Sequence, residues 1–201
     1  AVPLADHFAR VLATDPSADQ IANASPHPRV EYAVAPAEAC PLPDRSADLI
    51  AVAQALHWFD HERFYAEANR VGRPGAVVAA WSVEFRSIGA PVDAVVRRLL
   101  DEFVGPYWPP ERALVEDGYR SLPFPFAELK APRFEMTAEW DLAALLGYAG
   151  TWSCTKRFER AHGFRPVERL CAEFEQAWGD PTCTRTARWE LTLRAGRVAG
   201  S

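Results

Sequence analysis

The sequence predicts an α/β fold with a doubly wound, mostly parallel sheet. Short apolar segments rich in β-branched residues alternate with helix-compatible segments through the first half of the chain, which is the pattern of parallel strands with helices on both faces. An acid, Asp15, directly follows the first apolar segment. The 201 residues are 49% hydrophobic, enough to fill the core of one domain over residues 1–201.

In the first half, each strand is expected where a short apolar run stands between turn residues, and each helix where apolar residues recur at helical spacing. The expected elements are, in order, strand Arg10–Thr14, helix Pro16–Ala24, strands Val30–Val34 and Ala47–Ala53, helix His61–Val71 and strand Ala76–Val83.

The pattern changes after Gly89, where an amphipathic segment precedes an aromatic, proline-rich one. Residues 91–165 are therefore predicted to form a helical, aromatic-rich insertion that covers a site. The last two strands are expected to be antiparallel. The expected elements are helix Pro91–Val104, an irregular segment Gly105–Tyr119, strand Phe134–Trp140, helices Asp141–Gly150 and Pro166–Trp178, and strand Trp189–Arg194.

Charge and apolar runs exclude several classes of partner. The net charge is −5 and Lys and Arg form no dense run, so no nucleic-acid partner is expected. Apolar runs fall far short of the roughly 20 residues of a bilayer span, and the start AVPLADHF lacks the pattern of a signal peptide. We therefore expect a cytoplasmic protein without a membrane partner. The sequence does not indicate its oligomeric state.

Asp15 is the first candidate site residue. An acid at the carboxyl end of the second strand of a nucleotide-binding α/β unit can accept both ribose hydroxyls. An Asp before Pro16 can also form a turn or cap a helix, as can Ser17. The segment by itself leaves both interpretations open.

A longer motif follows between Val34 and Asp60. It reads PAEACPLPDRSADL and AQALHWFD, and FYAEANRVGRPGAVVAAW comes next. These segments resemble the class I S-adenosylmethionine-dependent methyltransferases, in particular the small-molecule subgroup of trans-aconitate methyltransferase-like proteins. The resemblance continues through GPYWPPER, GYRSLPFPF and AWGDP, and so covers almost the whole chain. It implies a Rossmann-like methyltransferase fold, S-adenosylmethionine as cofactor, and a small organic acceptor, with a carboxylate as one candidate.

The resemblance also implies where the cofactor binds. Asp15, with Pro16 beside it, would hold the ribose, and the Ala37–Glu38 pair would meet the adenine, mainly through backbone N–H groups. Gln54 and Ala55 would lie where a strand ends, the edge at which open α/β sheets bind ligands. The alternative for Ala37 and Glu38 is a solvated loop.

His57 is the candidate catalytic residue. A neutral imidazole can act as general base or donate a hydrogen bond to the substrate, although His57 can equally cap the strand end. His57 and His61 are four residues apart with Asp60 between them, but the HEXXH arrangement is absent. The four cysteines are widely scattered along the sequence, and they are expected to be reduced. They also lack metal-ligand spacing, so no metal is expected.

Aromatic and basic residues are candidates for the acceptor site. Trp58, Tyr107, Trp108 and Trp152 can wall a planar acceptor and shield a sulfonium, or they can fill the core. Arg112 can pair with a substrate carboxylate through its guanidinium fork. Arg157 is a second candidate for that contact.

The family's Gly-rich loop after its first strand is not in this sequence. We therefore expect a front segment of roughly 30 residues, one strand and most of a helix, in the natural protein. A sheet without that strand would have a gap between Arg10–Thr14 and Ala47–Ala53. Two alternatives stay open: a non-catalytic binding protein on a degenerate methyltransferase fold, and a nicotinamide-dependent oxidoreductase, which would need GxGxxG.

Overall fold

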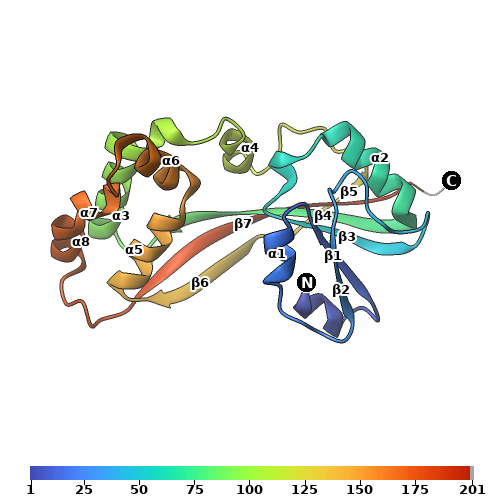
Figure 1. Cartoon of the computed structure of the whole chain (residues 1–201), viewed down its shortest axis with the longest axis horizontal. Coiled ribbons are helices and arrows are strands. Elements are labelled where there is room, and N and C mark those ends of the chain that lie inside the picture. Colours follow the sequence, from blue (N-terminus) through green and yellow to red (C-terminus); the bar gives the residue numbers. More distant parts are fainter. Residues whose placement is uncertain (200–201) are drawn as a thin grey trace. The chain divides into compact units, whose positions relative to one another are not determined.

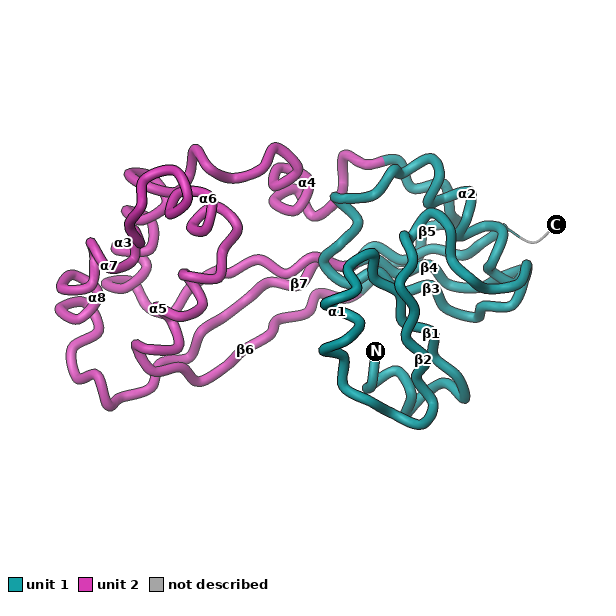
Figure 2. The backbone as a smooth tube through the Cα atoms, in the orientation of Figure 1, with its two compact units in different colours: residues 1–80, 123–131, 194–201 teal, residues 81–122, 132–193 magenta. Residues whose placement is uncertain are grey.

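The computed structural model describes residues 1–199 (Figure 1). The chain divides into two compact units, coloured separately in Figure 2. Unit 1 comprises Ala1–Ala80, Pro123–Ala131 and the end of the chain from Arg194, and unit 2 comprises Trp81–Leu122 and Pro132–Leu193. Strands β4 (Gly72–Ser87) and β7 (Arg185–Arg197) contribute residues to both.

Unit 1 begins with a 3-10 helix at Val2–Asp6, followed by a parallel pair of strands. Strand β1 (Val11–Asp15) pairs with β2 (Val30–Val34) so that Asp15 lies opposite Val34. Helix α1 (Ala18–Ala22) connects them, and its N-cap is Ser17, whose side chain accepts the Gln20 N–H. The last residue of each strand therefore lies at the same edge of the sheet.

The second sheet has the order β3-β4-β7-β5, with β6 also paired to β7. In unit 1 it contains β3 (Ala47–Ala53) and the short β5 (Ala127–Leu129), which is antiparallel to β7. Within residues 1–199, β1 and β3 are each the outer strand of their own sheet. The strands are thus divided where the sequence predicted a gap.

Helix α2 (His61–Val71) joins β3 to β4. The Asp60 side chain caps it by accepting the Arg63 N–H at 3.2 Å. Gly72 ends the helix, where a Cβ would lie 2.8 Å from the Ala68 carbonyl oxygen, so only glycine fits without a shift. The buried residues of α2 recur at helical spacing and belong to the core of unit 1: Phe64, Tyr65, Ala68 and Val71.

Unit 2 is a helical cluster packed on strand β6 (Phe134–Trp140), which is antiparallel to β7. Its fully buried side chains include Leu99, Leu145, Phe174 and Trp178. Its helices are α3 (Ala90–Leu99) with a π-helical continuation at Leu100–Val104, α4 (Arg112–Glu116), α5 (Leu142–Thr151), α6 (Ser153–His162), α7 (Pro166–Arg169) and α8 (Cys171–Trp178), with a 3-10 turn at Gly105–Tyr107.

The predicted α/β class is confirmed, and so is the antiparallel pair near the end of the chain. The prediction of one helix over Pro166–Trp178 is wrong, because Leu170 leaves the helical conformation at φ −104° and ψ 8° and separates α7 from α8. Helix α6 and strand β5 were not predicted. The segment Gly105–Tyr119, predicted to be irregular, contains α4.

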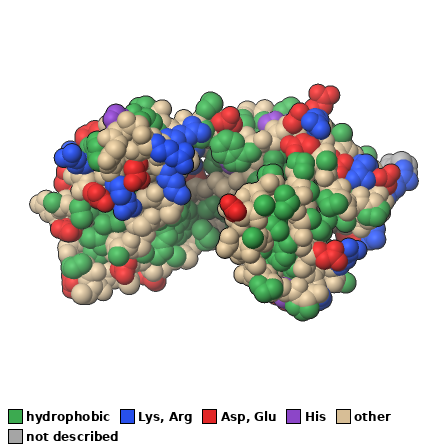
Figure 3. Space-filling model, in the orientation of Figure 1, with side chains coloured by type: hydrophobic (Ala, Val, Ile, Leu, Met, Phe, Trp, Pro, Cys, Tyr) green, Lys and Arg blue, Asp and Glu red, His purple; other side chains and the backbone are tan. Residues whose placement is uncertain are grey.

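No helix in the described part of the chain is both long and apolar enough to cross a bilayer. Acidic and basic side chains are interspersed over the viewed face of each unit (Figure 3).

The four cysteines are free thiols in very different environments. Burial raises the pKa of Cys154 in α6 to about 11, so little thiolate forms at neutral pH. Cys183 is exposed. We expect iodoacetamide to modify Cys183 in the native protein and Cys154 only after unfolding in denaturant. Peptide mass spectrometry measures both rates, and equal rates in the native protein would contradict the packing of α6.

Candidate functional site

Asp15 lies at the carboxyl end of β1 and its carboxylate forms a turn. Its Oδ1 accepts the Ser17 N–H at 2.8 Å, so the turn that the sequence allowed is present. Among residues 1–199, no group donates a hydrogen bond to Oδ2. One carboxylate oxygen is therefore available to a ligand while the other fixes the side chain.

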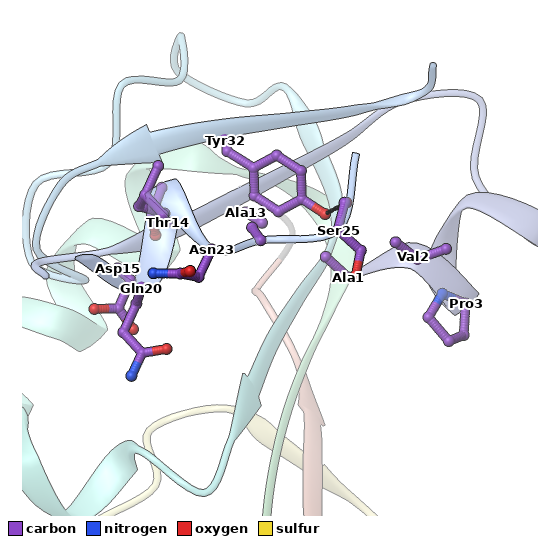
Figure 4. Close-up of a pocket in the computed structure, with 12 residues that line it drawn as sticks. Ala1, Val2, Pro3, Ala13, Thr14, Asp15, Gln20, Asn23, Ser25 and Tyr32 are labelled. Carbon is purple, nitrogen blue, oxygen red and sulfur yellow. Dashed lines mark hydrogen bonds between the residues drawn. The ribbon is translucent and has the colours of Figure 1, made fainter. Parts of the chain in front are cut away.

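A solvent-open groove of about 470 Å³ runs beside Asp15. Figure 4 shows Asp15 at one end of it and Val2 and Pro3 at the other. The Tyr32 hydroxyl donates to the Ser25 carbonyl at 2.6 Å within this groove. Its lining is mostly polar or small.

The loop after β2 begins directly beside Asp15. The Ala35 N–H donates to the Asp15 carbonyl at 3.2 Å, so the structure brings Asp15 and the start of the loop with Ala37 and Glu38 to one edge of the sheet. Glu38 Oε1 accepts the Asp60 N–H at 2.9 Å. The Glu38 side chain therefore ties the loop to the N-terminus of α2.

Beyond Ala37 and Glu38, the same loop is held by two side chains that sequence reasoning missed. Glu67 Oε1 accepts the Cys40 N–H at 2.7 Å. Arg70 donates to the carbonyls of Cys40 and Leu42 and to Asp44, at 3.1, 3.0 and 2.6 Å. The hydrogen bond from Arg70 lowers the pKa of the Glu67 carboxyl below its usual value. The signal in the sequence was the Glu67–Arg70 spacing of i and i+3, which places both on one helix face.

The end of β3 leads into a 3-10 turn, Leu56–Trp58, that carries the candidate catalytic residue. His57 is 9% exposed, and its ring centroid lies 4.7 Å from that of Trp58. Trp58 is 55% exposed. Between β3 and this turn, Gln54 has φ 52°, a left-handed conformation uncommon for a residue with a side chain, and Ala55 follows it. Such strain concentrates at functional sites.

The residues that could have suggested a metal have other partners. His61 Nε2 lies 3.0 Å from the Leu56 carbonyl oxygen, and Asp60 caps α2. Within residues 1–199, no group of three or more His, Cys, Asp and Glu side chains is arranged to hold a metal ion.

Three acceptor candidates meet in unit 2. The rings of Trp108 and Trp152 have centroids 6.2 Å apart, and the Arg112 guanidinium lies 4.6 Å above the Trp108 ring. Arg112 also pairs with Glu116 at 3.0 Å and with Glu84 at 3.3 Å. A substrate carboxylate at Arg112 would therefore have to compete with two carboxylates of the chain.

Tyr107 has a different environment from the two tryptophans. Its hydroxyl is hydrogen-bonded to His162, and its ring contacts Phe158 edge-on at 5.2 Å. These contacts favour a packing role for Tyr107. Arg157 lies exposed on α6.

Sequence comparison shows which proteins this chain is similar to. A family model described as "Methyltransferase domain" matches residues 1–80. A solved structure described as a type II methyltransferase from Anaeromyxobacter dehalogenans is 47% identical, covers 100% of this chain and 85% of its own, and superimposes with a TM-score of 0.91. The chain belongs to the class I S-adenosylmethionine-dependent methyltransferases. S-adenosylmethionine is the methyl donor of this family.

A second relative is matched over part of its length, and a more distant structure shares the fold alone. A protein of Dictyostelium discoideum named as a methyltransferase is 33% identical over 163 residues, and the chain spans 62% of that relative. A structure from Anabaena variabilis, 20% identical with a TM-score of 0.52, shares the fold. None of these three relatives bears the trans-aconitate name, so that subgroup stays a prediction.

Proposed function

We propose that this methyltransferase binds S-adenosylmethionine at the carboxyl edge of the unit 1 strands and transfers its methyl group to a small organic acceptor. One observation carries the proposal: the Ala35–Asp15 hydrogen bond brings a strand-end carboxylate and the loop with Ala37 and Glu38 to one edge. An adenosine needs both, an acceptor for the ribose hydroxyls and backbone groups for the base. The residues present therefore fit this part of the cofactor.

Each candidate has a role in this proposal. Asp15 accepts ribose hydroxyls through Oδ2, with Pro16 fixing the chain beside it. Ala37 meets the adenine, and Glu38 sets the position of that loop through Asp60. Gln54 and Ala55 present backbone and amide groups where β3 ends.

S-adenosylmethionine supplies an electrophilic methyl group on a sulfonium, so the protein needs only to align the acceptor and exclude water. His57 accepts a proton from a hydroxyl or amine acceptor, or donates a hydrogen bond to a carboxylate acceptor. The exposed ring of Trp58 shields the reacting groups. Trp108, Trp152 and Arg112 in unit 2 stay sequence-based candidates for contacts with the acceptor, whereas Tyr107 packs on Phe158 and His162.

Isothermal titration of S-adenosylhomocysteine into the full-length protein tests the cofactor assignment. We expect saturable binding with a stoichiometry of one, and none with NAD, which is the control for a nicotinamide site. A protein that binds neither compound would contradict the proposed function. Turnover is then measured as S-adenosylhomocysteine release with panels of small carboxylates, phenols and amines.

A further inference from the structure

We propose that Glu67 and Arg70 are positioning residues for the adenine-binding loop, an inference that rests on the proposed function. The two side chains bind the backbone of Cys40 and Leu42 and the Asp44 side chain, and thereby fix Ala37 and Glu38 just before them. Neither residue would contact the cofactor.

All three nitrogens of the Arg70 guanidinium donate hydrogen bonds to the loop or to Glu67. Nη1 donates to Leu42 O and Asp44 Oδ1, Nη2 to Cys40 O and Glu67 Oε1, and Nε to Glu67 Oε2 at 2.8 Å. The planar fork of an arginine can satisfy these directions at once, whereas the point charge of a lysine cannot. Two of the acceptors are main-chain carbonyls, so the contact constrains backbone and not only side chains.

Glu67 and Arg70 together form a clamp on this loop, in which Glu67 accepts hydrogen bonds and Arg70 donates them. Glu67 Oε1 accepts both the Cys40 N–H and an Arg70 N–H, and its side chain is only 11% exposed. Cys40 is therefore held through its N–H by Glu67 and through its carbonyl by Arg70. A peptide unit held at both ends has little freedom to rotate.

The loop returns to the same helix at its far end. Arg45 has φ 51° and donates its N–H to the Arg70 carbonyl at 2.8 Å, and the Ser46 N–H donates to the Val71 carbonyl at 2.8 Å. These bonds satisfy carbonyls that a helix end otherwise leaves without partners. With Glu38 bonded to the Asp60 N–H, the loop is fixed to α2 at its start, middle and end.

The contacts of Glu67 and Arg70 differ from those of an ordinary exposed ion pair. Arg73 and Asp48 form such a pair at 2.6 Å with both side chains more than half exposed, and pairs of that kind contribute little. Arg70 and Glu67 instead bind backbone between the adenine loop and β3. Their geometry matches that of supporting residues that hold a site in place.

The decisive variant is Arg70→Lys, which keeps the charge and removes the fork. We expect about tenfold weaker binding of S-adenosylhomocysteine, an equal loss for adenosine because the loop faces the base, and little change in kcat at saturating S-adenosylmethionine. Tyr65→Phe is the matched control. It lies on the same helix and loses a 2.6 Å hydrogen bond to the Pro123 carbonyl, so it lowers stability without touching the loop.

The thermal midpoint of each variant separates positioning from stability. Affinity lost in Arg70→Lys and retained in Tyr65→Phe, at similar midpoints, supports the inference. Wild-type affinity in Arg70→Lys, or equal losses in both variants, overturns it. If Arg70→Lys does not fold, Glu67→Gln tests the same clamp, since it keeps the side-chain shape and removes the charge. A wild-type protein that binds no S-adenosylhomocysteine would overturn the proposed function itself.

Discussion

Replacing Asp15 with alanine is expected to weaken S-adenosylhomocysteine binding about a hundredfold. A carboxylate that accepts two ribose hydroxyls makes two charge-assisted hydrogen bonds, each contributing on the order of 1.5 kcal/mol or more, and about 1.4 kcal/mol corresponds to a factor of ten. Isothermal titration measures the loss directly.

Two further variants separate charge from turn formation at this position. Asp15→Asn keeps an oxygen that can accept the Ser17 N–H but lacks the negative charge, so we expect an intermediate loss. Asp19→Asn makes the same change on the exposed first turn of α1 and should bind like wild type. If Asp15→Asn regains full affinity, the turn and not the charge is what matters. Full affinity in Asp15→Ala would contradict the ribose assignment.

Replacing His57 with alanine is expected to lower kcat by roughly 10²–10⁴-fold if the imidazole is the general base, with S-adenosylhomocysteine affinity unchanged. The largely buried ring can act only on an acceptor that reaches the end of β3. Turnover is measured with the best acceptor from the panel of carboxylates, phenols and amines. His61→Ala is the control, because that ring lies near the Leu56 carbonyl and has no proposed part in the chemistry.

The pH dependence distinguishes the two roles of His57. A base must be neutral, so wild-type kcat would fall toward acid pH. A hydrogen-bond donor to a carboxylate acceptor would not lose activity toward acid pH, because the neutral and the protonated imidazole both carry an N–H. His57→Ala should remove whichever dependence is present. A variant with wild-type kcat and wild-type pH profile would leave His57 only the strand-end role.

The elements of unit 1 could be predicted because their ends carry local signals. Helix α2 begins after the capping Asp60 and buries residues at helical spacing, and β2 and β3 are apolar runs between turns. The helix break at Leu170 has no such signal: there is no proline or glycine, and Leu170 itself is 2% exposed. Leu170 instead belongs to the buried core of unit 2, and tertiary packing of this kind can override local helix propensity. Helix α6 was missed for a similar reason, since its N-cap, Trp152, provides no capping side chain.

The candidate site also contains residues whose position could be predicted from the sequence and residues whose position could not. Strand-end residues such as Asp15 and Gln54 could be predicted because parallel strands place their carboxyl ends at one edge. The clamp formed by Arg70 could not, because its carbonyl partners lie 28 and 30 residues earlier in the chain and carry no side-chain signature. The pairing of Arg112 with Glu84 and Glu116 likewise depends on tertiary structure.

The left-handed backbone of Gln54 means that a substitution which raises stability at this position would lower activity. A side chain in that conformation costs about 1–3 kcal/mol, whereas a glycine would adopt φ 52° without strain. Selection for higher thermal stability would therefore favour glycine at position 54, which removes the amide side chain at the end of β3. The stability gained at position 54 would then be accompanied by the loss of a side chain that is proposed to contact the cofactor.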